Sequence, residues 1–256
     1  MKKTDRTNEV NISNEGYLIK IVEYNNYDDV WIEFQDEYKI RVHTTYKHFK
    51  NGGVKNPYHK VMYNIGYFGQ NKYSRKTHPK IYDIWHDMLK RCYDPYYLNK
   101  HLTYIDCYVC EEWHNFQNFA KWYEENYYEV ENQRVHLDKD ILNKGNKIYS
   151  PETCIFVPQR INVLFTKSDN KRGKYPIGVS YYSKDKALYV NCSIIENDNK
   201  KQKYLGIFSI NEPYQAFTCY KNFKEKYIKQ IADEYKELIP IELYEAMYRY
   251  EVEIND

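Results

Sequence analysis

The sequence predicts an α+β protein, because stretches of strand-like and helix-like periodicity occur in separate parts of the chain. Apolar and polar residues alternate near the N-terminus, in the middle and again after residue 174, whereas large apolar residues recur every three or four positions between residues 80 and 122. With 256 residues, the chain has room for two or three small domains. We predict a small β module over residues 1–75, a central unit over 76–166, and a three-stranded sheet with C-terminal helices over 167–256.

The first two parts give distinct signals. "GYLIKIVEYN" and "DVWIEFQD" alternate with period two around the turn "NNYD", which predicts two paired strands. Two helices should follow, each with an apolar face. The first face comprises Ile81, Trp85, Met88, Leu89 and Cys92, and the second Trp113, Phe116, Phe119 and Trp122. Strands are then expected at "QRVHLDKDIL" and "CIFVP", before a helix from Gln159 that turns Ile161, Leu164 and Phe165 inward.

The last part predicts three strands, a long helix and a short final helix. "IGVSYY", "ALYVNCSI" and "KYLGIFS" are the strands, joined by polar turns. Asn211 is the predicted N-cap of the long helix, Pro213 lies in its first turn and Pro240 ends it. Its apolar face should pack on the sheet through Tyr214, Phe217, Tyr220 and Phe223.

Charge is segregated along the chain although the net charge is only +2. Residues 167–206 hold nine Lys/Arg against four Asp/Glu, and residues 232–256 hold two against eight. A basic stripe among acidic neighbours favours a surface that binds a polyanion, although a solvated surface explains the charge almost as well.

No apolar run approaches the length of a membrane span, and no apolar segment follows the first lysines. We therefore expect a cytoplasmic protein without a membrane partner or a small-molecule cofactor. Six cysteines are too few for a disulfide scaffold in a chain of this size. Cys107 and Cys110 form a CxxC pair that Cys92 and Cys154 could complete as a structural zinc site, and buried free thiols are the favoured alternative.

The motif with the most chemistry is "LDKDILNKGNKIYSPETCIFVPQRIN", residues 137–162. A strand–loop–strand–helix unit brings an Asp on the first strand toward an Asn on the helix, and such oxygen ligands suit Mg²⁺ or Mn²⁺. The predicted metal ligands are Asp138 and Asn162.

This motif and its flanking segments resemble the HNH, or ββα-metal, nucleases, particularly the phage homing-endonuclease-like proteins. The resemblance covers residues 82–165. It implies metal-dependent hydrolysis of a phosphodiester bond in double-stranded DNA, which produces a nick or a double-strand cut. The implied location is the cytoplasm of a bacterial host. It implies catalytic roles for Asp138 at the acidic position, Lys139 at the position of the general-base histidine, and Thr153 at the middle-Asn position.

Lys139 is a poor base, because an ordinary lysine is almost entirely protonated at pH 7 and the flanking carboxylates favour its charge further. His136 is the better candidate, since alternate residues of a strand share a face and His136 would lie beside Asp138. An ordinary strand histidine is the competing interpretation.

"GVSYY", "ALYVNCSI", "YLGIFS" and the following helix resemble the APETALA/ethylene-response-factor type of DNA-binding domain over residues 174–231. That resemblance implies a three-stranded sheet laid against the duplex. The predicted DNA contacts are Arg172, Lys174, Tyr181, Lys184, Lys186, Tyr189, Asn191, Lys201 and Lys203.

We therefore predict a DNA-binding, HNH-like endonuclease. A catalytically inactive DNA-binding regulator on a nuclease frame is the alternative, favoured by the departures at Lys139 and Thr153.

Overall fold

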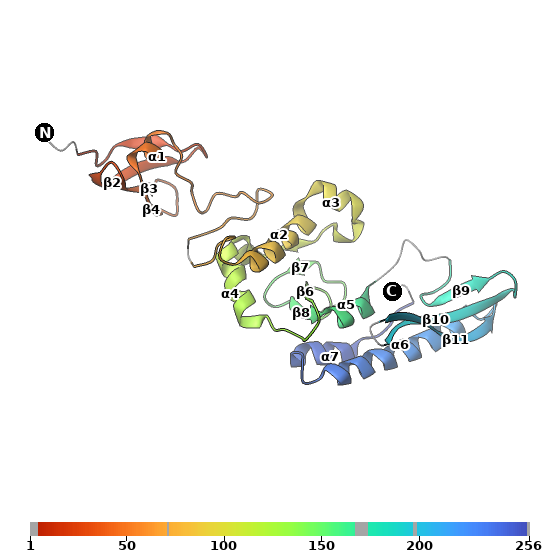
Figure 1. Ribbon diagram of the computed structural model, residues 1–256. Helices are drawn as coiled ribbons and strands as arrows, with labels where there is room; N and C mark the ends of the chain where they lie inside the picture. The colour runs from red at the N-terminus through yellow and green to blue at the C-terminus, as the bar shows by residue number, and fades with distance from the viewer. Residues whose placement is uncertain (1–4, 71, 167–173, 197–198, 255–256) are drawn as a thin grey trace. The chain divides into compact units, whose positions relative to one another are not determined.

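The computed structural model describes residues 5–70, 72–166, 174–196 and 199–254, and it confirms the α+β fold class (Figure 1). These residues belong to two compact units, Met1–Tyr123 and Glu124–Asp256. The three-part division into residues 1–75, 76–166 and 167–256 stays a prediction.

The first unit begins with an antiparallel sheet whose strands follow chain order. Its elements are β1 (Val10–Ile12), β2 (Leu18–Asn26), β3 (Asp29–Phe34), β4 (Arg41–Thr44) and α1 (Tyr46–Lys50). Alternate residues of β2 and β3, such as Ile19, Ile21 and Ile32, are fully buried against Phe49 of α1. The strands predicted from period two are therefore present, with their apolar face inward.

The rest of this unit is mainly helical. Its elements are α2 (Pro79–Tyr93), α3 (Pro95–Lys100), the short 3-10 helices η1 (Leu102–Tyr104) and η2 (Glu111–His114), β5 (Tyr108–Val109) and α4 (Phe116–Asn126). All five residues of the predicted face of α2 are buried. Trp113 was expected on the second helix but lies in η2. Asn115 separates η2 from α4, and its side chain accepts a hydrogen bond from the backbone N–H of Gln117 in the first turn of α4.

The second unit contains a strand pair with a following helix, and then a three-stranded sheet with two helices. Its elements are β6 (Val135–Asp138), β7 (Ile148–Tyr149), β8 (Ile155–Pro158), α5 (Gln159–Phe165), β9 (Val179–Tyr182), β10 (Ala187–Glu196), β11 (Asn199–Ser209), α6 (Pro213–Tyr235) and α7 (Ile241–Arg249). β6 pairs antiparallel with β8, and β10 lies between β11 and β9 in an antiparallel sheet.

Helix α6, which runs alongside the three-stranded sheet in Figure 1, contributes to two cores. Near its N-terminus, Phe217 packs with Leu188 and Val190 of the three-stranded sheet. Near its C-terminus, Ile228 and Ile231 belong to a second core, which also contains residues of β8, α5 and α7. The strand–strand–helix unit and the C-terminal sheet are thus joined by one 23-residue helix.

The structure corrects three details of this helix. Glu212, not Asn211, is the N-cap residue, and its carboxylate accepts from the backbone N–H of Ser209. The helix ends at Tyr235, before Pro240, which is instead the N-cap residue of α7. Tyr214, which was expected on the face that packs on the sheet, is 69% exposed in the first turn of the helix.

Among the described residues, no helix combines the length and apolarity needed to cross a bilayer.

Candidate functional site

His136 and Asp138 lie on β6, which pairs with β8, whereas Lys139 and Thr153 lie in the segments that connect β6, β7 and β8. His136 pairs with Val157 and Asp138 with Ile155 across the antiparallel strands, so each pair shares a face. Ile155 and Val157 pack in the same core as Ile161 of α5. His136 and Asp138 therefore lie on the face of β6 that α5 covers, and the strand periodicity predicted their common side.

Asp138 ends β6 and shapes the turn that follows. Its Oδ1 accepts hydrogen bonds from the backbone N–H groups of Asp140, at 2.9 Å, and Ile141, at 2.8 Å. Burial, followed by the negative charge of Asp140, raises the pKa of Asp138 to about 6, although the two backbone hydrogen bonds act in the opposite direction. The fold thus holds two carboxylates close together, and a bound cation would relieve their repulsion.

Lys139 is buried, with 7% of its surface exposed. Its Nζ donates to the Asp140 carboxylate at 3.1 Å and to the backbone carbonyl of Asn146 at 2.9 Å. An ammonium group is a hydrogen-bond donor only, so in this form it cannot accept a proton from water. Lys139 therefore anchors the loop after β6.

Asn146 fastens the same loop from the other side. Its Nδ2 donates to the carbonyls of Lys139, at 2.6 Å, and Ile148, at 2.7 Å. Thr153, which was assigned to the middle-Asn position, donates through Oγ1 to the carbonyl of Ile148 at 2.7 Å and lies 3.1 Å from Ser150 Oγ. A side-chain amide that bridges the loop is therefore present, seven residues before Thr153.

His136 is half-buried, and its Nε2 is enclosed without a hydrogen-bond partner among the described residues. Buried side-chain nitrogens are usually paired, so each exception requires an explanation. One explanation is a nitrogen kept available for a water molecule or substrate. Asn162 lies on α5 next to the buried Ile161 and is half-buried, and its backbone carbonyl accepts from Thr166 Oγ1.

No group of three or more His, Cys, Asp or Glu side chains that could hold a metal ion occurs within the described parts of the chain. Mg²⁺ keeps several waters and needs few protein oxygens, so the oxygen donors around Asp138 fit that ion in type. Cys92, Cys107 and Cys154 are buried, and Cys110 is half-buried. The zinc site stays a prediction.

The C-terminal sheet has one face on α6 and an opposite, open face. On the open face, the rings of Tyr182, Tyr189 and Tyr204 form a row with centroid separations of 5.3 and 5.8 Å. Asn191 pairs with Tyr204 and shares this face. Aromatic rings and an amide are thus presented together on one surface.

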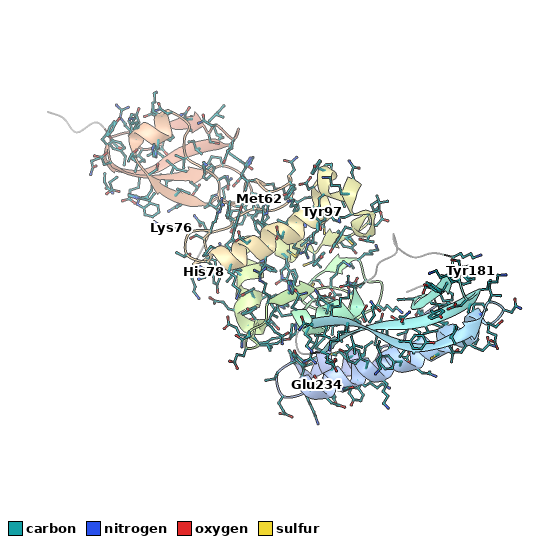
Figure 2. The ribbon with its side chains drawn as sticks, turned by 45° about the vertical axis from the view of Figure 1, so that its right-hand side comes forward. Met62, Lys76, His78, Tyr97, Tyr181 and Glu234 are labelled. Atoms are coloured by element: carbon teal, nitrogen blue, oxygen red, sulfur yellow. The ribbon has the colours of Figure 1, made fainter. Side chains whose placement is uncertain are left out.

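The other predicted DNA contacts are distributed around this sheet. Lys184 and Lys186 are exposed in the turn between β9 and β10, and Tyr181 lies at the outer edge of the sheet (Figure 2). By strand register, Tyr181, Lys201 and Lys203 belong to the side that faces α6, where all three remain exposed. Lys174 precedes β9, with its Nζ 5.2 Å from the centroid of the Tyr175 ring. Arg172 lies outside the described residues.

Comparison with known proteins yields no match: no family model, no curated protein and no solved structure matches the chain.

The predictions from the sequence did not include two residues of interest, Asn146 and Lys224. Asn146 was visible within the "GN" of the motif, but its role depends on how the loop closes. Lys224 is buried in the middle of the apolar stripe of α6. The signal was its spacing, because Phe217, Tyr220 and Lys224 recur at helical intervals on one face.

Proposed function

We propose that this protein binds double-stranded DNA through the open face of its C-terminal sheet and hydrolyses a phosphodiester bond at the β6–β8–α5 unit with Mg²⁺ or Mn²⁺. The observation that carries the proposal is the placement of His136 and Asp138 on the face of β6 that α5 covers. The resemblance of this segment to phage HNH endonucleases supports the same reaction, and a bacterial host's cytoplasm is its proposed location.

Each residue has a proposed role. His136 accepts a proton from the attacking water through its unpaired Nε2. The carboxylates of Asp138 and Asp140, with the amide oxygen of Asn162, would hold the divalent ion. The ion supplies stabilisation of the negative charge that develops at the phosphate and leaving oxygen. Lys139, Asn146 and Thr153 keep the connecting loop in place for this arrangement.

DNA binding is proposed for the row Tyr182, Tyr189 and Tyr204, together with Asn191 and the turn lysines. Aromatic side chains contact sugars and bases, while lysines neutralise phosphates without reading sequence. We therefore expect affinity that depends strongly on salt and only moderately on sequence.

The test is fluorescence anisotropy with a mixed-sequence duplex. With about five or six phosphate contacts, raising the salt concentration from about 50 to 200 mM should weaken binding by roughly two to three decades. Tyr189→Ala should weaken binding by about fivefold or more, and Tyr214→Ala, an exposed tyrosine of α6, should not. Absence of binding at low salt, or equal effects of the two substitutions, would contradict DNA binding by the open face.

A second candidate, a DNA-binding regulator without nuclease activity, is favoured by one specific observation. Asp138 Oδ1 already accepts two backbone hydrogen bonds, and Lys139 already neutralises Asp140, so both carboxylates have structural roles. Under this function DNA binding is retained and divalent ions produce no cleavage.

A further inference from the structure

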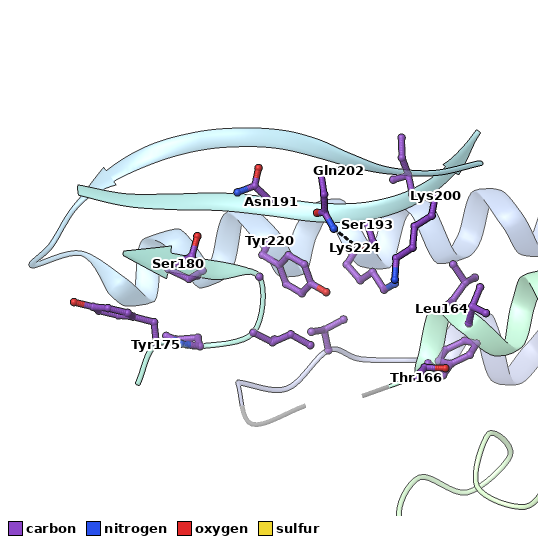
Figure 3. Close-up of a pocket in the computed structure, with 18 of the residues that line it drawn as sticks. Leu164, Thr166, Tyr175, Ser180, Asn191, Ser193, Lys200, Gln202, Tyr220 and Lys224 are labelled. Carbon is purple, nitrogen blue, oxygen red and sulfur yellow. Dashed lines mark hydrogen bonds between the residues drawn. The ribbon is translucent and has the colours of Figure 1, made fainter. Parts of the chain in front are cut away.

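A pocket of about 1030 Å³ lies within the second unit, between the C-terminal sheet, α6 and the end of α5 (Figure 3). This volume is at the upper end of the range typical of small-molecule sites. Its walls include Phe165, Tyr175, Tyr220 and Tyr250, with aliphatic side chains between them. The site predicted at β6 does not use this pocket.

Among the residues that the structure describes, the charged ones that line the pocket are all cationic. They are Lys174, Lys200 and Lys224, and no described Asp or Glu belongs to the lining. Lysines without carboxylates favour an anionic ligand.

Lys224 is the most informative of these residues. It is 8% exposed, and no described carboxylate forms an ion pair with it. Burial lowers the pKa of Lys224, and the nearby positive charge of Lys200 lowers it further, although Cys192 acts in the opposite direction. A buried lysine without an anion is unfavourable, so its presence in the middle of an apolar helix stripe indicates a partner that binds reversibly.

The uncharged polar groups define the rest of the ligand. Asn191, Ser193 and Gln202 line the pocket from β10 and β11, and Gln202 Nε2 donates to Ser193 Oγ at 2.6 Å. An acyl chain bound to Lys224 would leave these groups facing hydrocarbon. A nucleobase has donors and acceptors on its edge and a flat face for aromatic rings, so it matches both kinds of wall.

We propose that this pocket binds a nucleotide, with its phosphate on Lys224 and Lys200 and its base between the aromatic walls and the amides of Asn191 and Gln202. Gly178 gives the pocket its shape, since its φ is +77° and a Cβ at this position would lie 2.0 Å from Cδ2 of Tyr220. Asn191 belongs to both the pocket and the open sheet face, so the nucleotide has two sources: a free mononucleotide, or a nucleotide turned out of a bound strand. The inference does not depend on cleavage at β6.

Calorimetric titration of the full chain with the four deoxynucleoside monophosphates tests the free source, with inorganic phosphate as the comparison. Lys224→Met should raise the dissociation constant about 10- to 100-fold, because a hydrogen bond to a charged group is lost. Lys226→Met, an exposed lysine two residues along α6, is the matched control and should leave it unchanged. Circular dichroism confirms that both variants fold.

A duplex that contains 2-aminopurine tests the second source. Fluorescence should change when the base leaves the duplex stack for the aromatic pocket, with wild type and Lys226→Met but not with Lys224→Met. The proposal is overturned if neither source gives a signal, or if Lys224→Met retains full binding. Inorganic phosphate that binds as tightly as the mononucleotides would overturn the nucleobase assignment. If the protein does not bind DNA, only the duplex signal is lost and mononucleotides still bind. That result is therefore distinguishable from a pocket that does not bind nucleotides.

Discussion

Asp138 combines a strand position that the sequence predicts with an environment that only the folded chain creates. Period two places it beside His136, and the pairing with β8 agrees. Its burial and its closeness to Asp140 depend on the turn that follows β6, which its own Oδ1 helps to form. The sequence could therefore identify the residue but not its raised pKa.

This raised pKa gives a prediction about stability and pH. Below pH 3.8 the carboxyl is protonated in both the folded and unfolded states; between pH 3.8 and about 6 only the folded state keeps the proton. Wild-type stability should therefore fall across this window as pH rises. Asp138→Asn retains an acceptor oxygen without the charge, so at pH 7 it should be more stable than wild type by about 1–3 kcal/mol.

Denaturant unfolding at pH 4 and pH 7 measures the difference. The advantage of Asp138→Asn should be small at pH 4 and larger at pH 7, whereas the exposed Glu237→Gln should show no such dependence. An advantage that does not change with pH would contradict the assigned environment.

Lys139 was assigned to the position of a base because of its place in the motif, and its burial could not be predicted. The ammonium group reaches the carbonyl of Asn146 only because the loop between β6 and β7 folds back on itself. Contacts of this kind depend on loop conformation, which periodicity does not specify.

At the scale of elements, the side-chain amide of Asn146 bridges the two ends of the loop from Lys139 to Ile148. Asn146→Ala removes two short hydrogen bonds to carbonyls and should lower the free energy of unfolding by about 1–3 kcal/mol. Thermal unfolding followed by circular dichroism measures this change. Asn143→Ala, an exposed position of the same loop, should change stability little, and equal effects of the two substitutions would mean that Asn146 does not fasten the loop.

The buried Lys224 of helix α6 gives the second prediction for a single element. Lys224 interrupts an apolar stripe that otherwise supplies two cores, so Lys224→Met should raise the melting temperature by a few degrees while it weakens nucleotide binding about 10- to 100-fold. A stability gain together with a loss of binding is typical of a functional residue. If Lys224→Met melts below both wild type and Lys226→Met, the lysine has a structural role instead.

Most elements were predictable because their signals are local. The strands of the first sheet, the buried face of α2 and the three C-terminal strands all follow from periodicity. The predicted N-cap of α6 was one residue too early, and Trp113 lies three residues before α4, because local hydrogen bonds at Ser209 and Asn115 decide where those helices begin.

At the scale of the whole molecule, the unit Glu124–Asp256 contains both proposed activities. Helix α6 packs beneath the sheet at one end and against the core of β8 and α5 at the other, so the proposed DNA-binding face and the candidate catalytic strand share one scaffold. The sequence could not predict this coupling, because it depends on contacts between segments far apart in the chain. It follows that DNA bound on the sheet has a fixed relation to β6.

Relaxation of supercoiled plasmid in the presence of Mg²⁺ or Mn²⁺ tests the central claim most directly. Wild type and Tyr214→Ala should convert the plasmid to the nicked form, whereas His136→Ala and Asp138→Ala should each slow the reaction by about 100-fold or more. Full activity of Asp138→Ala, or the absence of nicking by wild type with either ion, would contradict catalysis at this site.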